Sequence, residues 1–469
     1  MNDFQLAWKN LWRNKRRTII TAASVFFAVF FALIMRSIQL GSYDRMFKNI
    51  IESYSGYLQL QHQDYFDDPV LDNSFEMDQE HIETIKKNEN VEKIVPRLES
   101  FALAAAGSRT QGVIVMGIDP ENEVSDIKNR MVKFRFTEEA VNRMENEALP
   151  DRIKKLLEIF RDESYSGTGR LMLDLGISVK DSSAILPVLR KYSSFSNGYF
   201  TEKDTGKVVI GNGLSEYLRI NIGDTVVLIG QGYHGVSAAG KYMVSGIVKL
   251  PAPDIDNSIV YLPINSARQL YGAEGISTSA VITLKKNDEK SVMEIYSGLR
   301  QIIPEPLTVR NWRELNALLI NQLDADNKSG MIMIGILYLV IAFGVFGTVL
   351  MMLAERRREF GMLVSVGMQK HKLSKVIALE LLMTGLLGVI SGVIVSLPVV
   401  LYFNVHPLRF TGQMAHMWED YGFEPVMPTL LPDSYYLWQT VVVLIILTIA
   451  VLFSIRKIFR INVISSLKA

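Results

Sequence analysis

The chain has 469 residues, of which 48% are apolar and 21% are charged, and its mean hydropathy is +0.16. This mixture argues against a purely soluble protein and favours apolar membrane segments joined to a water-exposed part. Because the chain contains no cysteine, it excludes a disulfide framework, a thiolate metal site and a cysteine nucleophile, whereas the net charge of +1 says nothing about partners.

Residues 1–17 predict a basic amphipathic helix. At helical spacing, one set of apolar residues shares a face and basic residues lie on the others: Phe4, Trp8, Leu11 and Trp12 against Lys9, Arg13 and Arg16. Tryptophan on the apolar side of a basic helix suits the headgroup layer of a membrane. We therefore expect a cytoplasmic amphipathic helix here, and the alternative is a disordered tail.

Four apolar runs meet or approach the roughly 20 helical residues that a bilayer core requires. We expect transmembrane helices at residues 18–40, 330–354, 376–403 and 437–456. The apolar core of the first run is longer than that of a signal peptide, and no A-x-A-like cleavage site follows it. We therefore interpret the first run as an uncleaved anchor.

Basic residues predict the orientation of these helices. They cluster before the first run, between the second and third, and after the fourth, whereas the segment between the third and fourth has only Arg409. With four spans all these clusters fall on one side, which the positive-inside rule makes cytoplasmic. Both termini, a loop at 355–375 and a tail at 457–469 are then cytoplasmic. Residues 41–328 and 404–436 lie outside, in the periplasm if the cell has an outer membrane.

The segment 41–328 shows a mixed α/β pattern in which short apolar runs alternate with helical candidates. Strands are expected at residues 56–61, 112–118, 207–211, 224–230, 241–250, 257–263 and 279–286. Helices are expected at residues 78–89, 213–220, 263–271 and 288–303. A charged, helix-like stretch at 137–163 is interpreted as an insertion. This alternation indicates an α/β or α+β body rather than a sandwich.

Both ends of this segment predict helices that continue the first and second membrane helices. Each carries apolar residues toward one side: Ile38, Met46, Phe47 and Ile50 in the first, and Leu315, Leu318, Leu319 and Leu323 in the second. Two such helices would form a stalk above the membrane. The alternative is two unrelated surface helices.

The segment GVSAAGKY, residues 235–242, matches the G-x-x-x-x-G-K pattern of a phosphate-binding loop. Tyr242 stands where a serine or threonine would hold magnesium, and a predicted strand follows where a phosphate loop requires a helix. We interpret the segment as a turn between two strands. The histidines show no metal-ligand spacing and no G-x-S-x-G elbow occurs, so we expect no catalytic residue, cofactor or metal site.

The third apolar run carries a carboxylate and three spaced glycines. Glu380 lies about one turn from the cytoplasmic end, where we expect it to reach headgroups or Lys375; the alternative is an ion or proton path. Gly385, Gly388 and Gly392 lie on the same helix, and small residues at this spacing allow close helix contact. We expect them to pack inside the subunit or against a second one.

The cytoplasmic loop ERRREFGMLVSVGMQKHKLSKVIALE, from Glu355 to Glu380, is too long for a minimal turn. Its charges cluster at either end, and its middle has an apolar side: Met362, Leu363, Val366 and Met368. This pattern predicts a short amphipathic helix under the membrane, of a kind that docks into a groove on a soluble partner. The alternative is a charged loop that only connects two spans.

The same loop contains E-R-x-x-E-F-G-x-L-x-S-x-G, from Glu355 to Gly367. This motif resembles the coupling-helix signature of the MacB/FtsX/LolC-type permeases, the mechanotransmission ABC transporters. Further segments are similar to this family. Residues 6–25 resemble the amphipathic entry into its first helix, and RINVISSLKA resembles its closing segment. Residues 208–230, together with 245–272, resemble the outer domain of LolC/LolE-type lipoprotein-releasing permeases. The resemblance covers nearly the whole chain except residues 125–200.

The resemblance implies an α-helical membrane protein with four transmembrane helices plus a large mixed α/β extracytoplasmic domain on a helical stalk. It implies that this chain is not an enzyme, because a separate ATPase pair binds under the coupling helices. The ATPase contact would comprise Glu355, Arg356, Glu359, Phe360, Gly361, Leu363 and Gly367. A second permease subunit, as a homodimer or heterodimer, would complete the complex in the bacterial inner membrane.

The implied function is that of a permease subunit that couples cytoplasmic ATP hydrolysis to periplasmic movements. Lipoprotein release, or export of a related amphiphile, is the leading hypothesis, with cargo and membrane lipids as partners and no nucleic acid. The alternative is an FtsX-type signalling permease that activates an extracytoplasmic partner without transporting cargo. A membrane-anchored outer-face enzyme forms a third class.

Overall fold

The computed structural model describes residues 3–13, 15–178, 180–195, 197–410, 413–420 and 425–459. The chain divides into two compact units. The helical unit comprises Met1–Arg45, Asn321–Leu408 and Val426–Ala469, and the α/β unit comprises Met46–Ile320 and Arg409–Pro425. The predicted closing segment, residues 460–469, lies outside the described residues.

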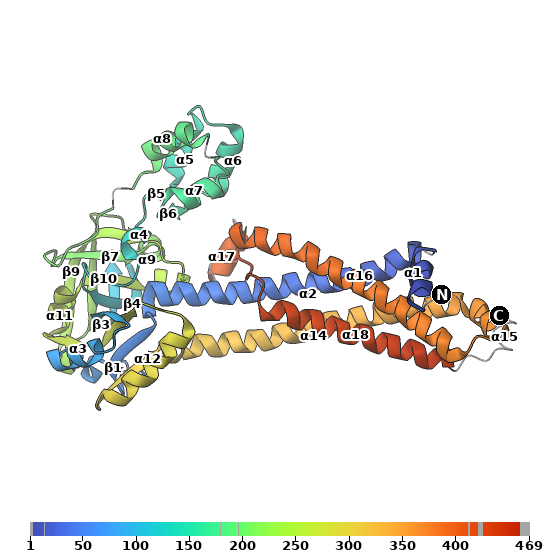
Figure 1. Cartoon of the computed structure of the whole chain (residues 1–469). Coiled ribbons are helices and arrows are strands. Elements are labelled where there is room, and N and C mark those ends of the chain that lie inside the picture. The colour runs from blue at the N-terminus through green and yellow to red at the C-terminus, as the bar shows by residue number, and fades with distance from the viewer. Residues whose placement is uncertain are drawn as a thin grey trace. The chain divides into compact units, whose positions relative to one another are not determined.

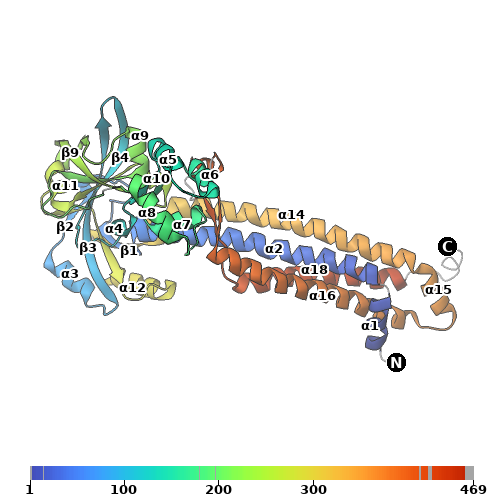
Figure 2. The same ribbon diagram turned by 90° about the horizontal axis from the view of Figure 1, so that it is seen from above.

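Long helices form the body of the helical unit and run alongside one another (Figures 1 and 2). They are α2 (Lys15–Ile50), α14 (Ala317–Glu355), α16 (Lys370–Val405) and α18 (Ser434–Phe459). Among the described residues, these four contain the spans that are long and apolar enough to cross a membrane. The prediction of four spans is therefore confirmed, and α2 and α14 extend well beyond the roughly 20 residues that a bilayer requires.

Two shorter helices, α1 (Asp3–Arg13) and α15 (Arg357–Ser365), lie at the same end of this unit (Figure 2). The predicted apolar face of α1 is divided: Leu11 is buried, whereas Trp8 and Trp12 are exposed. α1 packs against α16. The rings of Trp8 and Trp12 are arranged edge to face, with their centroids 6.1 Å apart. Exposed indole rings beside basic residues are typical of a membrane interface.

The glycines of α16 lie at close helix contacts within the chain. Gly388 and Gly392 face α2, and Gly385 faces α18. A Cβ atom at Gly388 would come within 2.6 Å of the carbonyl oxygen of Ala22, and one at Gly392 within 2.9 Å of Cβ of Val29. These separations are too short for real side chains, so the backbones approach this closely because the glycines have none.

A nine-stranded mixed sheet forms the centre of the α/β unit, in the order β13-β1-β12-β3-β4-β10-β7-β9-β8. Its strands are β1 (Leu58–His62), β3 (Val91–Ala106), β4 (Arg109–Ile118), β7 (Lys207–Gly211), β8 (Thr225–Gln231), β9 (Ser237–Val248), β10 (Ile259–Pro263), β12 (Ser279–Leu284) and β13 (Leu307–Asn311). β3 also pairs with β8, so β3, β4, β10, β7, β9 and β8 close into a ring. β10 runs parallel to β4 and β7 parallel to β9, while the other pairs are antiparallel.

Two large clusters of buried apolar side chains pack against different parts of the sheet. A large core joins strands of the closed ring with helices α9 (Asn212–Leu218) and α11 (Ile264–Tyr271). A second core joins β1, β12 and β13 with α3 (Gln79–Lys86) and α12 (Glu289–Ile302). These helices confirm the four that the sequence predicts in this unit.

Short elements complete the chain. They are η1, a π-helix (Ile51–Ser55), the 3₁₀ helices η2 (Leu71–Asn73) and η3 (Tyr233–Gly235), α4 (Ile127–Arg130), α10 (Pro253–Asp256), α13 (Trp312–Leu315), α17 (Gln413–Asp420), β2 (Phe75–Glu76), β11 (Ile276–Ser277), β14 (Leu408–Arg409) and β15 (Val426–Met427). Strands are present at all seven positions predicted from the sequence, but β3 and β13 were not expected. The predicted turn at 235–242 is also too long, because Ser237–Val248 already belongs to β9.

The insertion forms a helical group with its own core (Figure 1). It contains β5 (Phe134–Arg135), α5 (Glu138–Glu145), α6 (Asp151–Ile159), β6 (Ser164–Tyr165), α7 (Thr168–Asp174) and α8 (Ser182–Ser193). Pro150 separates α5 from α6, so the helix-like stretch at 137–163 is two helices. Phe136, Met144 and Leu189 are fully buried, which explains how this short stretch holds a fixed shape.

A buried polar cluster ties the π-helix η1 to β3. Arg97 donates to the backbone carbonyl of Tyr54 and pairs with Glu123, where its Nε lies 3.3 Å from Oε2. The Tyr54 hydroxyl donates to Glu99 at 2.6 Å. Burial raises the pKa of Glu99, whereas Arg97 holds the pKa of Glu123 below its ordinary value against the effect of burial. Glu123 is therefore the carboxylate that balances the arginine charge.

We predict that Gly388→Leu lowers the thermal unfolding temperature of the full chain in detergent by several degrees. The added side chain has no space against α2, so α16 must move away. The matched control is Gly344→Leu on α14, where a Cβ atom meets nothing within 4 Å. Equal losses in the two variants, measured by fluorescence during heating, would contradict a specific contact at Gly388.

We predict that Arg97→Met destabilises the folded chain by about 3–5 kcal/mol, because Glu123 would remain buried without its cation. Adding Glu123→Leu should recover part of the loss, since neither charge then remains. The control Arg143→Met removes an exposed pair with Glu139 and should change stability very little. Denaturant unfolding measures all three, and similar losses for Arg97→Met and Arg143→Met would refute the role of the buried pair.

Candidate functional site

The candidate site is built around α15, which follows α14 after one residue. Arg356 lies between the two helices, and Gly367 ends α15 with a φ of +104°, a conformation that glycine tolerates without strain. The N–H groups of Gly367 and Met368 donate to the carbonyls of Val364 and Leu363 at 3.1 and 2.9 Å. These bonds satisfy carbonyl groups at the helix end, so Gly367 closes α15 and turns the chain into α16.

Arg356 anchors α15 to α16. Its NH1 group donates to both carboxylate oxygens of Glu380, at 3.2 and 2.9 Å, and its Nε group donates to Glu359 at 3.0 Å. The side chains of Arg356 and Glu380 are only 7% and 4% exposed. Because buried charges require their partners, this pair fixes the start of α15 against α16.

Glu380 was expected to reach headgroups or Lys375, and its burial argues against the headgroups. The carboxylate is buried inside the helical unit, and Arg356, 24 residues earlier in the chain, is one of its partners. A carboxylate in an apolar run demands a nearby cation, which was the available signal. The sequence alone could not select Arg356 from the neighbouring Arg357 and Arg358.

Phe360 holds the same side of α15 as Arg356. Its side chain is fully buried in the core that contains Met352, Leu373 and Ile377, and the guanidinium of Arg356 lies 5.2 Å from the centre of its ring. Gly361 is also buried. These residues therefore face the permease's own helices in this conformation.

The other side of α15 is exposed and apolar. Val366 is 88% exposed, Met362 49% and Leu363 40%. Neighbouring apolar side chains without cover typically mark a surface for a partner. Of the seven residues predicted in the ATPase contact, the structure exposes four, namely Glu355, Glu359, Leu363 and Gly367, and buries three, namely Arg356, Phe360 and Gly361.

Polar contacts connect the ends of several helices around this surface. Arg13 of α1 lies 3.7 Å from Glu359, and the Lys370 ammonium of α16 donates to the backbone carbonyl of Phe459 in α18 at 3.4 Å. The exposed pair contributes little stability by itself. It shows, however, that the end of α1 lies near α15.

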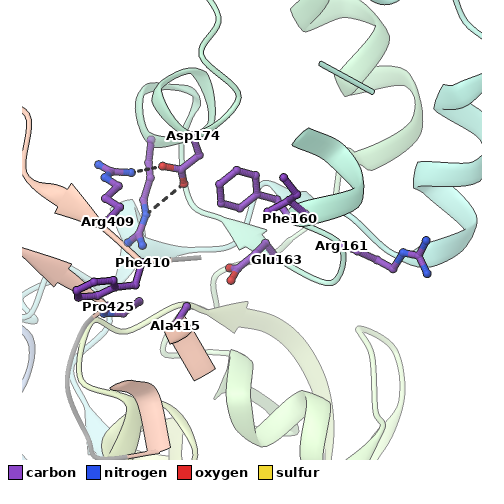
Figure 3. Close-up of a pocket in the computed structure, with 10 residues that line it drawn as sticks. Phe160, Arg161, Glu163, Asp174, Arg409, Phe410, Ala415 and Pro425 are labelled. Atoms are coloured by element: carbon purple, nitrogen blue, oxygen red, sulfur yellow. Dashed lines mark hydrogen bonds and ion pairs between the residues drawn. The ribbon is translucent and has the colours of Figure 1, made fainter. Parts of the chain in front are cut away.

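A second polar contact lies within the α/β unit, where the segment Arg409–Pro425 meets the insertion (Figure 3). Asp174 of α7 is buried and pairs with Arg409, and Arg170 lies 3.8 Å from the same carboxylate. Burial raises the pKa of Asp174 in spite of both arginines. The adjoining cavity of about 40 Å³ holds little more than one water molecule, so this is a docking contact rather than a ligand site.

Within the described residues, no three histidine, aspartate or glutamate side chains come together as metal ligands would. The lysine of the phosphate-loop pattern, Lys241, lies in β9 opposite Val227 of β8. That strand pairing offers no helix N-terminus to a phosphate. The glycines Gly385, Gly388 and Gly392 lie further along α16 and take no part in the surface of α15.

Residues 331–463 match the family model of the FtsX-like permease C-terminal region. The lipoprotein-releasing system transmembrane protein LolC of Neisseria meningitidis is 25% identical over 42% of this chain and 48% of that protein. LolC of Xylella fastidiosa is 20% identical over 54% of this chain and 63% of that protein. An uncharacterized ABC transporter permease of Methanocaldococcus jannaschii is 25% identical over 42% of this chain and 49% of that protein.

One solved structure with some likeness is the periplasmic region of MacB from Actinobacillus actinomycetemcomitans, with 12% sequence identity and a TM-score of 0.30. The match covers 59% of this chain and 98% of that structure. Another is the extracellular domain of the noncanonic ABC-type transporter YknZ from Gram-positive bacteria, with 14% sequence identity and a TM-score of 0.28. That match covers 55% of this chain and 100% of that structure.

Four membrane-spanning helices, a mixed α/β unit and the matched C-terminal region define an integral membrane permease. The match to the FtsX-like permease model and the likeness to LolC proteins support an inner-membrane permease of the MacB/FtsX/LolC type. The match spans about half the length of the first curated relatives.

We predict that Arg409→Glu releases the segment Arg409–Pro425 from the insertion, because it places two carboxylates together at a buried position. Chymotrypsin cleavage after Phe410 in the full chain should become several-fold faster, and adding Asp174→Arg should restore protection. Arg161→Glu is the control, because Arg161 lines the same cavity but pairs with Glu158 and Glu138. Unchanged cleavage in Arg409→Glu would refute the contact.

Proposed function

We propose that this chain is the membrane subunit of an ABC transporter in which a separate ATPase binds α15 and drives movement of the α/β unit outside the membrane. The observation that carries the proposal is the structure of α15: one side is locked into the permease by Arg356 and Phe360, and the other exposes Val366 and its apolar neighbours. A helix of this kind passes force to the helices that hold it.

Charge supports a cytoplasmic position for α15. Exposed basic residues gather at the end of the helical unit that contains α1 and α15: Arg13, Lys15, Arg16, Arg357, Arg358, Lys372 and Lys375. By the positive-inside rule this end faces the cytoplasm, together with both termini. The α/β unit then belongs to the periplasm, and the predicted domain boundaries form part of this proposal.

The proposed ATPase contact differs in detail from the set predicted by sequence. Glu355, Glu359, Leu363 and Gly367 are exposed and remain candidates for direct contact, joined by Met362 and Val366. Arg356, Phe360 and Gly361 are buried and are proposed to position the helix instead. The division matters because only the first group can be replaced without disturbing the permease itself.

The long helices α2 and α14 are proposed to carry the movement. They are tied together within the helical unit where Arg36 donates to Asn327 at 2.7 Å and Tyr43 donates to Asp326. Gly330 adds close contact with Gln39. Helices cross-linked at several levels move as one body, as a stalk requires.

The proposed cargo is a lipoprotein or a related amphiphile, handled together with a second permease subunit. The support is the likeness to two LolC proteins, whose names describe a lipoprotein-releasing system. Cargo release in reconstituted vesicles distinguishes this proposal from a signalling permease, which would activate an outside partner without moving lipoprotein.

We predict that Val366→Asp weakens binding of the ABC ATPase at least about tenfold, because it places a carboxylate at the centre of an apolar contact. The permease itself should remain folded, since the side chain is exposed. Pull-down of the ATPase from detergent, followed by ATP hydrolysis, measures the effect. Leu173→Asp, at an exposed apolar position on α7, is the matched control and should bind normally.

Phe360→Ala separates positioning from contact. It removes a buried ring and should lower both the unfolding temperature of the permease and its coupling to the ATPase, with a stability loss of about 3–5 kcal/mol. Val366→Asp should lower only the coupling. Normal ATPase binding by Val366→Asp would reject the proposed docking side of α15.

A further inference from the structure

A cavity of about 760 Å³ opens in the helical unit between the start of α2 and the junction of α14 with α15. Its volume lies in the range of pockets that hold small organic ligands, about 300–1,000 Å³. Basic side chains line one part of the cavity, and apolar side chains line another. Glu355 and Glu359, which are proposed above as ATPase contacts, also line this cavity.

The cationic part of the cavity is formed by Arg13, Lys15 and Arg16. Arg13 lies near Glu359, but within the described part of the chain neither Lys15 nor Arg16 forms an ion pair. The carboxylates of Glu355 and Glu359 also line the cavity, and Glu359 is shared by Arg356 and Arg13. Lys15 and Arg16 therefore leave a surplus of positive charge beside Glu355, which favours a small anion.

The apolar part of the cavity lies next to these charges. Ile20 of α2 and Met351 of α14 both line it and are exposed. A soluble anion gains nothing from such a wall, whereas an amphiphile can place its head on the cations and a hydrocarbon chain on the apolar side chains. The arrangement therefore fits a ligand that is both anionic and oily.

The neighbouring structure places the cavity at headgroup depth. Trp8 and Trp12 are exposed on α1, and α1 ends at Arg13, itself a lining residue. Indole rings collect at the membrane–water interface, where lipid phosphates are found. Basic side chains near the cytoplasmic surface attract anionic lipids by about 1 kcal/mol each.

We propose that this cavity binds an anionic phospholipid, with the headgroup phosphate on Lys15 and Arg16 and an acyl chain along Ile20 and Met351. The proposal rests on the cytoplasmic position proposed for α1, and its test requires no ATPase. Glu359 and Arg356 belong both to the cavity and to the attachment of α15, so a bound lipid lies against the residues that hold this helix. The lipid would thus support α15 from the side of α2.

The test uses the full chain purified in mild detergent and mixed with phosphatidylglycerol or phosphatidylcholine. Native mass spectrometry then counts the lipids retained by each chain. We expect phosphatidylglycerol to be retained over phosphatidylcholine, and Lys15→Gln/Arg16→Gln to reduce this retention at least about fivefold. Ile20→Asn should reduce it as well, because the acyl chain loses its apolar wall.

The matched control is Lys372→Gln/Lys375→Gln, which removes the same charge from exposed residues of α16 outside the cavity. Equal losses in the two double variants would overturn the proposal, because any basic surface would then suffice. Equal retention of the two lipids by the unaltered chain would also overturn it.

A soluble source of phosphate is tested without any variant. If millimolar inorganic phosphate or glycerol phosphate displaces phosphatidylglycerol from the unaltered chain, the cavity recognises a free anion and the lipid proposal fails. Resistance to both anions supports it. Failure of ATPase binding in the earlier experiments leaves these outcomes unchanged, so the two proposals can fail separately.

Discussion

The buried ion pair between Arg356 and Glu380 is the interaction on which the proposed coupling end depends. It joins the residue before α15 to α16, and both side chains are largely buried. In such surroundings each charge stabilises the other, because a buried ion without a partner is costly. α15 therefore cannot tilt independently of α16, and a push on its exposed side is transmitted to a membrane helix rather than absorbed by a loose loop.

The α/β unit uses a similar device where the chain leaves the π-helix η1. The last carbonyl groups of a helix lack partners within the helix, and Arg97 supplies one to the carbonyl of Tyr54 while Glu123 balances its charge. Both arginines thus act at a helix boundary, one between α14 and α15 and one at the sheet. A stiff connection at each boundary is what a mechanism based on movement of whole helices requires.

The sequence predicted the membrane helices and most of the sheet because long apolar runs and alternating patterns are local signals. It missed β3, where Pro96, Arg97 and Glu99 interrupt the pattern, and two of its three strand pairings, with β12 and β8, come from distant segments. It also grouped Phe360 with Leu363 in the expected ATPase contact, whereas Phe360 is buried in the core and Leu363 is exposed. Local hydrophobicity does not reveal which face of a short helix its neighbours cover.

The closed ring of strands has a consequence for association with other proteins. Because β8 pairs with β3 as well as with β9, β8 is not an edge strand. Among the described strands of the main sheet, the edge strand is β13. An open edge is where an extended peptide can add as a further strand, or where sheets aggregate. β13 leads through the capped helix α13 directly into α14, so any chain that extended the sheet there would lie next to the start of a membrane helix.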